Sequence, residues 1–300
     1  MSRIALKESI KEKKRFFLDG AMGTQLIWQG ADAGKCNEKL NIDSPETVLE
    51  VHKAYFRAGS DTVLTNTFGA NEIALQRHEL DSKTEELNKA AAELARKAAG
   101  DDKYVLGDIG PSGDFLEPLG SLIEQQLTEA FTRQAKALDE GGVDGFIIET
   151  MTDLEEVIAA IKAVRSVNTE KPLLVSMAFD SGNGDFRTMM GQDYASVIKE
   201  ISAYNIDAVG FNCGKMSLED YIELSRRYVQ CVRDSNLDCK IMAELNAGIP
   251  ELVDGKPVYK VSPEEFADAV AKVHDNGVDI IGGCCGTSPE HIKAMVEKFA

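Results

Sequence analysis

Eight short apolar runs alternate along the chain with segments that carry helix signals. The runs lie at residues 16–18, 62–64, 104–107, 143–148, 173–178, 208–211, 240–243 and 278–281. Continuous apolar runs are typical of parallel strands buried on both faces, and their alternation with helices indicates βα units. Eight such units within 300 residues predict a closed (β/α)8 TIM barrel, a single domain over residues 1–300. A doubly wound open sheet is the alternative.

Helix signals fill the spacers between the runs. Ser44-Pro45-Glu46 has the pattern of an N-cap followed by proline at the first helical position, and Ser262-Pro263 and Ser288-Pro289 repeat it. Further helices are expected at about 84–99, 121–140, 193–204 and 217–235. Four helix-to-strand junctions resemble one another, at residues 58–61, 141–144, 204–207 and 276–279.

The charge balance excludes two classes of partner. The chain carries 33 Lys+Arg and 50 Asp+Glu, a formal net charge of −17, so no positive field exists to attract nucleic acid or an anionic membrane. No apolar run reaches the roughly 18 residues of a membrane span. The first residues are charged where a secretion signal is apolar, so a cytoplasmic protein is expected.

Polar residues follow almost every apolar run. They are Asp19, Asn66, Asp108, Glu149, Asn212-Cys213, Glu244-Leu245-Asn246 and Cys284-Cys285. Because a TIM barrel carries its active site at the C-terminal ends of its strands, these residues predict one polar site. A single polar residue there can simply mark the end of a strand, but three thiols at the ends of two strands fit that explanation poorly.

The cysteines indicate a metal. The run Gly282-Gly283-Cys284-Cys285-Gly286 must leave strand geometry for both sulfurs to reach one point, and glycine permits this. Cys213 supplies a third sulfur from another strand end. Three thiolates around one point repel one another unless a cation holds them, and zinc is the usual cation for such ligands. The spacing of Cys36, Cys231 and Cys239 matches no metal motif; we expect Cys231 in a helix core and Cys239 packed before a strand.

The ligand set narrows the chemistry. Three protein ligands leave a fourth tetrahedral position open, as in catalytic zinc sites. Zn²⁺ with three thiolates is formally negative, which disfavours making hydroxide and favours holding a fourth, nucleophilic thiolate. We therefore expect alkyl transfer to a substrate thiol. Histidine ligands are not expected, because His52, His274 and His291 fall in predicted helices and are predicted to lie on the surface.

At this point the motifs resemble those of the homocysteine S-methyltransferase family, and most closely the homocysteine-binding module of cobalamin-dependent methionine synthase. The resemblance covers about residues 16–299. It rests on residues 18–24, 64–70, 107–111, 149–150, 212–213, 246–248 and 282–287. It implies a (β/α)8 barrel with one Zn²⁺ bound by Cys213, Cys284 and Cys285, and homocysteine sulfur at the open position attacking an activated methyl group to give methionine.

The resemblance also implies how the amino acid is held. Asp19 and Glu149 are expected near the substrate, with Glu149 binding its ammonium group. Backbone N–H groups in the turn at Ala21, Met22, Gly23 and Thr24 are expected to take its carboxylate. The alternative for Asp19 and Glu149 is a structural hydrogen bond to a neighbouring strand end. Asn66, Asp108, Asn212 and Asn246 are expected to orient loops or neighbouring groups.

The methyl donor is not readable from these residues. Family members use methylcobalamin, S-methylmethionine or betaine; we expect a methyl-corrinoid carried on a separate protein, or on further modules if the chain is a fragment. The loops at 181–185 and 248–260 are potential rim contacts, or plain surface loops. Three alternatives stay open: a barrel that methylates a corrinoid from another substrate, a non-catalytic zinc barrel that docks a corrinoid protein, and a redox sensor with a Cys284–Cys285 disulfide.

Overall fold

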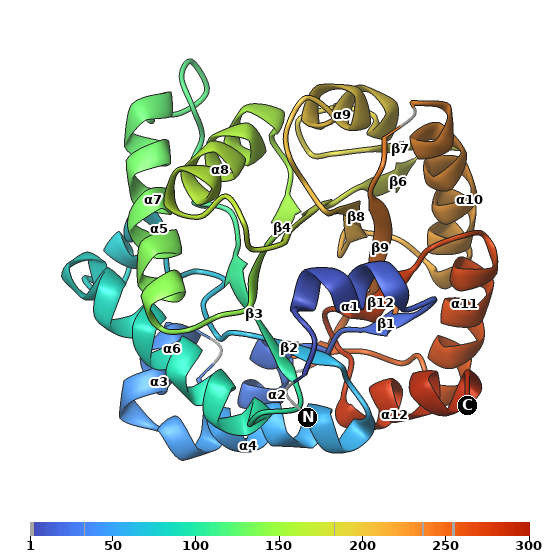
Figure 1. Ribbon diagram of the computed structural model, residues 1–300, viewed down its shortest axis with the longest axis horizontal. Helices are drawn as coiled ribbons and strands as arrows, with labels where there is room; N and C mark the ends of the chain where they lie inside the picture. The colour runs from blue at the N-terminus through green and yellow to red at the C-terminus, as the bar shows by residue number, and fades with distance from the viewer. Residues whose placement is uncertain (1–2, 33, 183, 236, 254–255) are drawn as a thin grey trace.

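The computed structural model describes residues 3–300 except 33, 183, 236, 254 and 255, and its centre is an eight-stranded parallel barrel (Figure 1). The strands are β1 Phe16–Phe17, β2 Thr62–Leu64, β3 Tyr104–Ile109, β4 Gly145–Met151, β5 Leu173–Met177, β8 Ala208–Asn212, β9 Lys240–Leu245 and β12 Ile280–Gly283. They pair in the order β1-β12-β9-β8-β5-β4-β3-β2. At the remaining seam the Asp61 N–H donates to the Phe17 carbonyl at 2.8 Å. All eight predicted strands and the predicted TIM barrel are confirmed.

Helices surround the barrel (Figure 1). They are α1 Leu6–Glu12, α2 Met22–Trp28, α3 Leu40–Asp43, α4 Pro45–Ala58, α5 Glu72–Gln76, α6 Thr84–Ala99, α7 Glu124–Glu140, α8 Leu154–Val167, α9 Tyr194–Ile201, α10 Leu218–Asp234, α11 Pro263–Asp275 and α12 Pro289–Lys298. Short 3-10 turns occupy Asn37–Lys39 and Asp81–Lys83. Ser262 caps α11 as predicted, whereas the Ser44 side chain, at the same position before α4, makes no capping hydrogen bond.

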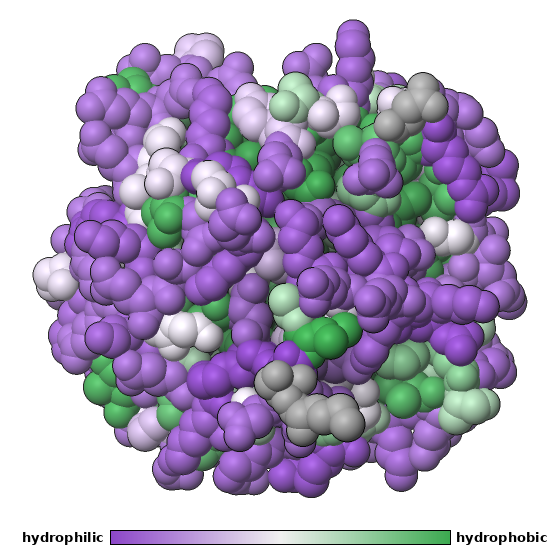
Figure 2. All heavy atoms as spheres, viewed as in Figure 1, coloured by the Kyte–Doolittle hydropathy of each residue, from purple (hydrophilic) through white to green (hydrophobic). Residues whose placement is uncertain are grey.

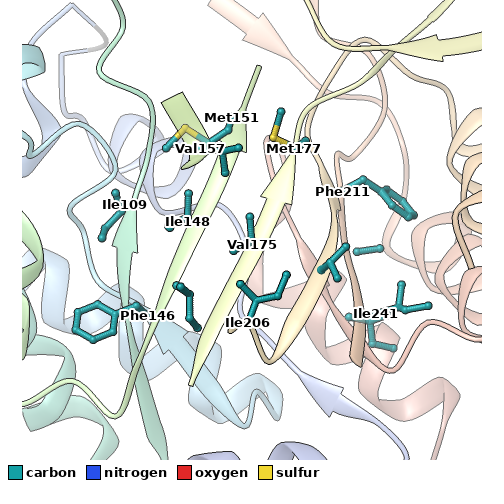
Figure 3. Close-up of a cluster of buried hydrophobic side chains, with 14 of the residues drawn as sticks. Ile109, Phe146, Ile148, Met151, Val157, Val175, Met177, Ile206, Phe211 and Ile241 are labelled. Carbon is teal, nitrogen blue, oxygen red and sulfur yellow. The ribbon is translucent and has the colours of Figure 1, made fainter. Parts of the chain in front are cut away.

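The strands separate two apolar layers. Phe146, Ile148 and Val175 point outward to the helices (Figure 3), while the intervening Ile147 and Leu174 pack inside the barrel. This alternation follows from the two-residue period of a strand. Because both faces are buried, the runs are apolar throughout, which is why the sequence pattern located them.

The N-terminal helix α1 covers the end of the barrel at which the strands begin, called the lower end from here on. Its Leu6 and Ile10 are buried against the inner layer, in contact with the cluster that contains Phe16 and Met242. Figure 1 shows α1 lying across the middle of the ring of strands, and Figure 2 shows that this face of the molecule is mostly hydrophilic. The sequence pattern did not indicate this helix.

The four similar junctions share an aspartate that accepts a backbone hydrogen bond from the preceding strand. Asp61, Asp144, Asp207 and Asp279 bind the N–H groups of Phe17, Val105, Leu173 and Ile241 at 3.0, 2.8, 3.0 and 3.3 Å. The junctions stand before alternate strands, β2, β4, β8 and β12. The four junctions are thus similar in sequence because each makes the same kind of aspartate-to-backbone hydrogen bond at the lower end.

Two of the upper loops form hairpins. The strands β6 Asp180–Gly182 and β7 Asp185–Arg187 pair antiparallel, as do β10 Glu251–Val253 and β11 Lys256–Val258. These hairpins occupy the two predicted rim loops, of which residues 183, 254 and 255 lie outside the described residues. Among the helices that the structure describes, none has the length and apolar character needed to cross a membrane.

Candidate metal centre and substrate cavity

Three cysteine sulfurs lie close together at the upper end of the barrel, which is the end at which the strands finish. Cys213 follows β8, and Cys284 and Cys285 follow β12. The Cys213 and Cys285 Sγ atoms are 3.9 Å apart, and those of Cys284 and Cys285 are 4.0 Å apart. All three sulfurs lie within 4.8 Å of one another. The structure therefore brings together the three residues that the sequence singled out as metal ligands.

Unusual backbone conformations make this convergence possible. Cys213 has a φ of 52° and Gly286 a φ of 79°, both in the left-handed region. Gly286 is the one glycine of its run used for this freedom. Gly282 and Gly283 belong to β12, where an added Cβ would lie 2.7 Å from Leu18 and 2.5 Å from Thr287, so they serve close packing. The left-handed conformation of Cys213 itself was not predicted, since nothing in its residue type favours it.

The sulfur triad fits a tetrahedral metal. With zinc–sulfur bonds of about 2.3 Å, three sulfurs on one ion stand about 3.8 Å apart, close to the two spacings above. The three thiols also cannot all lose their protons without a bound cation. Hydrogen bonds from Cys284 and Cys285 lower the pKa of the Cys213 thiol, and those same bonds raise the pKa of both donors. A three-thiolate state thus needs positive charge, which a bound metal ion supplies.

A cavity of about 230 Å³ opens beside the three sulfurs. It is smaller than the roughly 300–1,000 Å³ of drug-sized sites, so it suits a small ligand. Its lining includes Asp19, Met22, Gly23, Thr24, Asp108, Glu149, Glu244 and all three cysteines. None of the described residues that line it is Lys, Arg or His.

Five carboxyl groups line the cavity and give it its electrostatic character; Asp19, Glu38, Asp108 and Glu244 are buried, and Glu149 is half-buried. Burial raises the pKa of Glu149 to about 8, with a further rise from a Cys213 thiolate. Burial is also the largest cause of the raised pKa values of Asp19, Asp108 and Glu244, and repulsion from other cavity carboxylates adds to it. One oxygen of Asp108 and one of Glu244 have no hydrogen-bond partner among the described residues. The site is therefore poised to receive a cationic group.

Asp19 and Glu149 both make the structural bonds considered as their alternative role. An Asp19 oxygen accepts the Leu64 N–H at 3.1 Å, which holds the seam between β1 and β2. A Glu149 oxygen accepts from the Asn212 side chain at 2.8 Å. Both nevertheless line the cavity, so a bond to the fold and a place at the ligand are compatible for these two carboxyls.

The expected turn at residues 21–24 is the beginning of α2. Met22, Gly23 and Thr24 form its first turn, so their N–H groups have no partner within the helix. The Ala21 N–H is already bound to the Thr287 hydroxyl at 3.1 Å. Thr24 also ties the two halves of the site together, because its hydroxyl accepts the Gly286 N–H at 3.2 Å.

The sequence placed Glu244 in the predicted polar site without giving it a role. Glu38, which also lines the cavity, and Tyr259 were missed. Tyr259 follows the β10–β11 hairpin, and its ring packs against Gly286, where an added Cβ would lie 2.1 Å from it. Nothing in the sequence around Tyr259 marks it, since the contact depends on how the hairpin folds back.

The remaining cysteines and histidines lie apart from the triad. Cys36 is buried and donates to Glu38 at 3.1 Å, and Cys231 and Cys239 pack half-buried against the core, as expected. The predicted surface location is wrong for two histidines. His52 is fully buried in α4, where burial lowers its pKa to about 3, and His291 is 8% exposed, bound to Ser288 and Val261.

Comparison with known proteins assigns this barrel to a protein family. The family model described as homocysteine S-methyltransferase matches residues 16–299. The chain belongs to the homocysteine S-methyltransferase family. It is 30% identical over 301 residues to the methionine synthases of Mycobacterium leprae and Mycobacterium tuberculosis, with 94% of this chain and 24% of each relative covered. The chain thus spans about a quarter of the length of these curated relatives.

The fold of this family member also matches a solved structure. The metallated form of the homocysteine methyltransferase MmuM from Escherichia coli superposes with a TM-score of 0.79 at 22% identity, covering 98% of this chain and 99% of that one. At this identity the likeness supports the fold. The family resemblance drawn from the sequence motifs is confirmed.

Proposed function

We propose that the chain binds homocysteine through its sulfur at a zinc ion and transfers a methyl group to that sulfur, giving methionine. The observation that carries the proposal is the placement of the Cys213, Cys284 and Cys285 sulfurs beside a small cavity lined by buried carboxyls. Family membership supports the substrate, because the matching model is that of homocysteine S-methyltransferase.

The chain's own residues bind the two ends of the amino acid. Glu149 would accept a hydrogen bond from the substrate ammonium group, since it is half-buried, lines the cavity and faces no cationic side chain there. The free N–H groups of Met22, Gly23 and Thr24 would receive the substrate carboxylate. The thiol would bind at the three cysteines, which line the same cavity.

When bound, zinc would keep the substrate sulfur ionised while three thiolates leave that sulfur electron-rich. In the transfer, a bond forms from the homocysteine sulfur to the methyl carbon. The bond between that carbon and its donor breaks, and its electron pair leaves with the donor. The thiol proton is released when the substrate binds.

A methyl-corrinoid on a separate protein or module is the favoured donor. The relatives named methionine synthase support it, and they extend well beyond the region that this chain matches. S-methylmethionine and betaine are the other donors for this site. A cytoplasmic location is part of the same proposal.

The test is turnover of homocysteine by the zinc-loaded protein with methylcobalamin, S-methylmethionine or betaine, with methionine as the measured product. X-ray absorption at the zinc edge, with and without homocysteine, supplies the second measurement. We expect methionine from at least one donor and one added sulfur ligand. No homocysteine-dependent turnover with any donor would contradict the proposal. An unchanged zinc environment would favour a non-catalytic barrel that docks a corrinoid protein.

A further inference from the structure

One buried amide joins the cysteine cluster to the carboxyl group of Glu149. Asn212 is the last residue of β8, directly before Cys213, and is fully buried. Its Nδ2 donates to the Thr150 hydroxyl at 2.7 Å and to a Glu149 oxygen at 2.8 Å, and it lies 3.8 Å from the Cys284 sulfur. The same side chain therefore contacts the group proposed to bind the substrate ammonium and one of the proposed metal ligands.

The opposite end of the amide is anchored to two other strands. Its Oδ1 accepts the Thr150 N–H at 2.9 Å and the Ser176 hydroxyl at 2.7 Å. Because a backbone N–H can only donate and a carboxylate can only accept, these neighbours fix which end of the amide faces which. Asn212 thus spans β4, β5 and β8, and its Oδ1 is held by the Thr150 backbone and the buried Ser176 hydroxyl.

The backbone around this amide is unusual on both sides. Thr150 has a φ of 60° and Cys213 a φ of 52°, a conformation that non-glycine residues seldom adopt. The β4 register shifts between Ile148 and Met151, so Glu149 and Thr150 form an irregularity that turns both toward the cavity. Such conformations persist only where surrounding bonds hold them, and Asn212 supplies the bond to the Thr150 N–H.

We infer that Asn212 is a positioning residue that fixes the separation between Glu149 and the cysteine cluster, and so sets the length of the amino-acid thiol that the site accepts. The inference rests on the proposed function. A thiol amino acid engages both groups at once only if its carbon chain matches their separation. Homocysteine has one methylene more than cysteine, so a rigid spacing favours one of them, whereas a loosened Glu149 can move to suit either.

Two substitutions isolate the amide donor. Asn212→Asp keeps the shape and the acceptor but replaces the donor with a carboxylate oxygen, and Asn212→Ser removes the bridge without adding charge. The two variants differ in charge, and both lose the amide N–H donor at the distance from which Asn212 reaches Glu149. An effect common to both therefore reports the loss of that amide donor. Asn276→Asp is the matched control, because that amide likewise donates to a hydroxyl, of Ser225, and to a second acceptor, the Ile222 carbonyl, but it lies near the lower end, after α11.

The measurement is calorimetric binding of homocysteine and of cysteine to the zinc-loaded proteins, with zinc content and melting temperature recorded for each. We expect both Asn212 variants to keep zinc and to lose homocysteine affinity by about tenfold to a hundredfold, as for a lost charged hydrogen bond. Cysteine affinity should fall less, so the preference between the two thiols shrinks. In a Glu149→Gln background, Asn212→Ser should add little, because the amide acts through that carboxyl.

The outcomes separate the two proposals. If the wild-type protein binds no homocysteine, the proposed function fails. If the wild type binds it and both variants keep the wild-type ratio of homocysteine to cysteine affinity, the inference about Asn212 fails alone. Equal losses for both thiols with a lowered melting temperature would assign Asn212 a purely structural role, which also overturns the inference. If Asn212→Asp does not fold, Asn212→Ser decides.

Discussion

The two ends of the barrel use acidic residues in opposite ways. At the lower end, Asp61, Asp144, Asp207 and Asp279 each accept a backbone N–H and each pair with a Lys or Arg side chain. At the upper end, Asp19, Asp108, Glu149 and Glu244 line a cavity whose described lining contains no cationic side chain. The same chemical group therefore closes the fold at one end and is left without a counter-charge at the other.

This difference shows that the acidic residues stabilise the fold at the lower end and are available for binding at the upper end. Three lower aspartates pair with Arg3, Lys7 and Lys13, which flank or belong to α1, so the charges fasten the helix that covers that end. Most of the upper carboxyls are buried, at a free-energy cost that no cationic side chain in the described lining offsets. A metal ion and an ammonium group are the cations that would complete that end.

The largest effect is expected from removing a sulfur at the upper end. Replacing Cys284, Cys213 or Cys285 with Ala should abolish zinc binding and reduce methyl transfer to background, because two thiolates no longer hold the ion. The barrel should still fold, since the cluster lies above the core. Zinc content, activity and circular dichroism check this. Cys231→Ala, in α10 away from the cluster, is the control; full zinc and rate in Cys284→Ala would show the site assignment to be wrong.

A lower-end substitution should change stability and leave binding intact. Asp207→Asn removes the charge that faces Arg165 at 3.2 Å and Lys7 at 3.1 Å in a site where the aspartate is only 9% exposed. The cost should be about 2 kcal/mol, below the roughly 3–5 kcal/mol for a fully buried pair because Lys7 is partly exposed. Urea unfolding measures it. Asp268→Asn, whose pair with Lys298 is exposed, should change little.

An unchanged unfolding free energy in Asp207→Asn would mean that the lower-end charges do not support the fold. A large loss of homocysteine affinity in the same variant would break the division between the two ends.

The sequence reveals the upper end better than the lower. The strands are continuous apolar runs and the thiols end two of them, so both the barrel and Cys213, Cys284 and Cys285 follow from pattern. The helix α1 does not, because its two buried residues, Leu6 and Ile10, have meaning only once the barrel interior exists.

The sequence pattern does not reveal unusual backbone conformations or contacts between residues that are distant in the chain. The neighbouring sequence gives no signal for the left-handed φ of Cys213, and the bridge from Asn212 reaches Glu149, which lies 63 positions away. The burial of His52 was missed for a related reason: its helix face is decided by how α4 packs, and a lone histidine in a helix gives no direction.

A smaller effect on binding is expected at the proposed ammonium site. Glu149→Gln removes the charge while keeping the shape, so homocysteine binding should weaken by about 1–3 kcal/mol, or roughly fivefold to 150-fold in KM. The turnover number should change less, because the group acts on binding. Steady-state kinetics separate the two. Glu156→Gln is the matched control, since that buried carboxyl accepts the Ser112 N–H and does not line the cavity; equal KM values in both variants would remove Glu149 from the site.

The smallest effect is expected at Asp108. An Asp→Asn substitution there should raise the free energy of unfolding, whereas Asp207→Asn at the lower end should lower it. Burial, then repulsion from Glu149 and Glu244, raises the pKa of Asp108 well above its usual range. The folded state therefore keeps a proton that the unfolded chain releases above about pH 4, and stability falls as pH rises. Asp108→Asn imitates the protonated acid, so the metal-free variant should match wild type near pH 4 and exceed it by about 1 kcal/mol near pH 8. Urea unfolding across this range checks the sign, and a variant that is less stable than wild type at pH 8 would mean that the Asp108 charge is balanced by a partner.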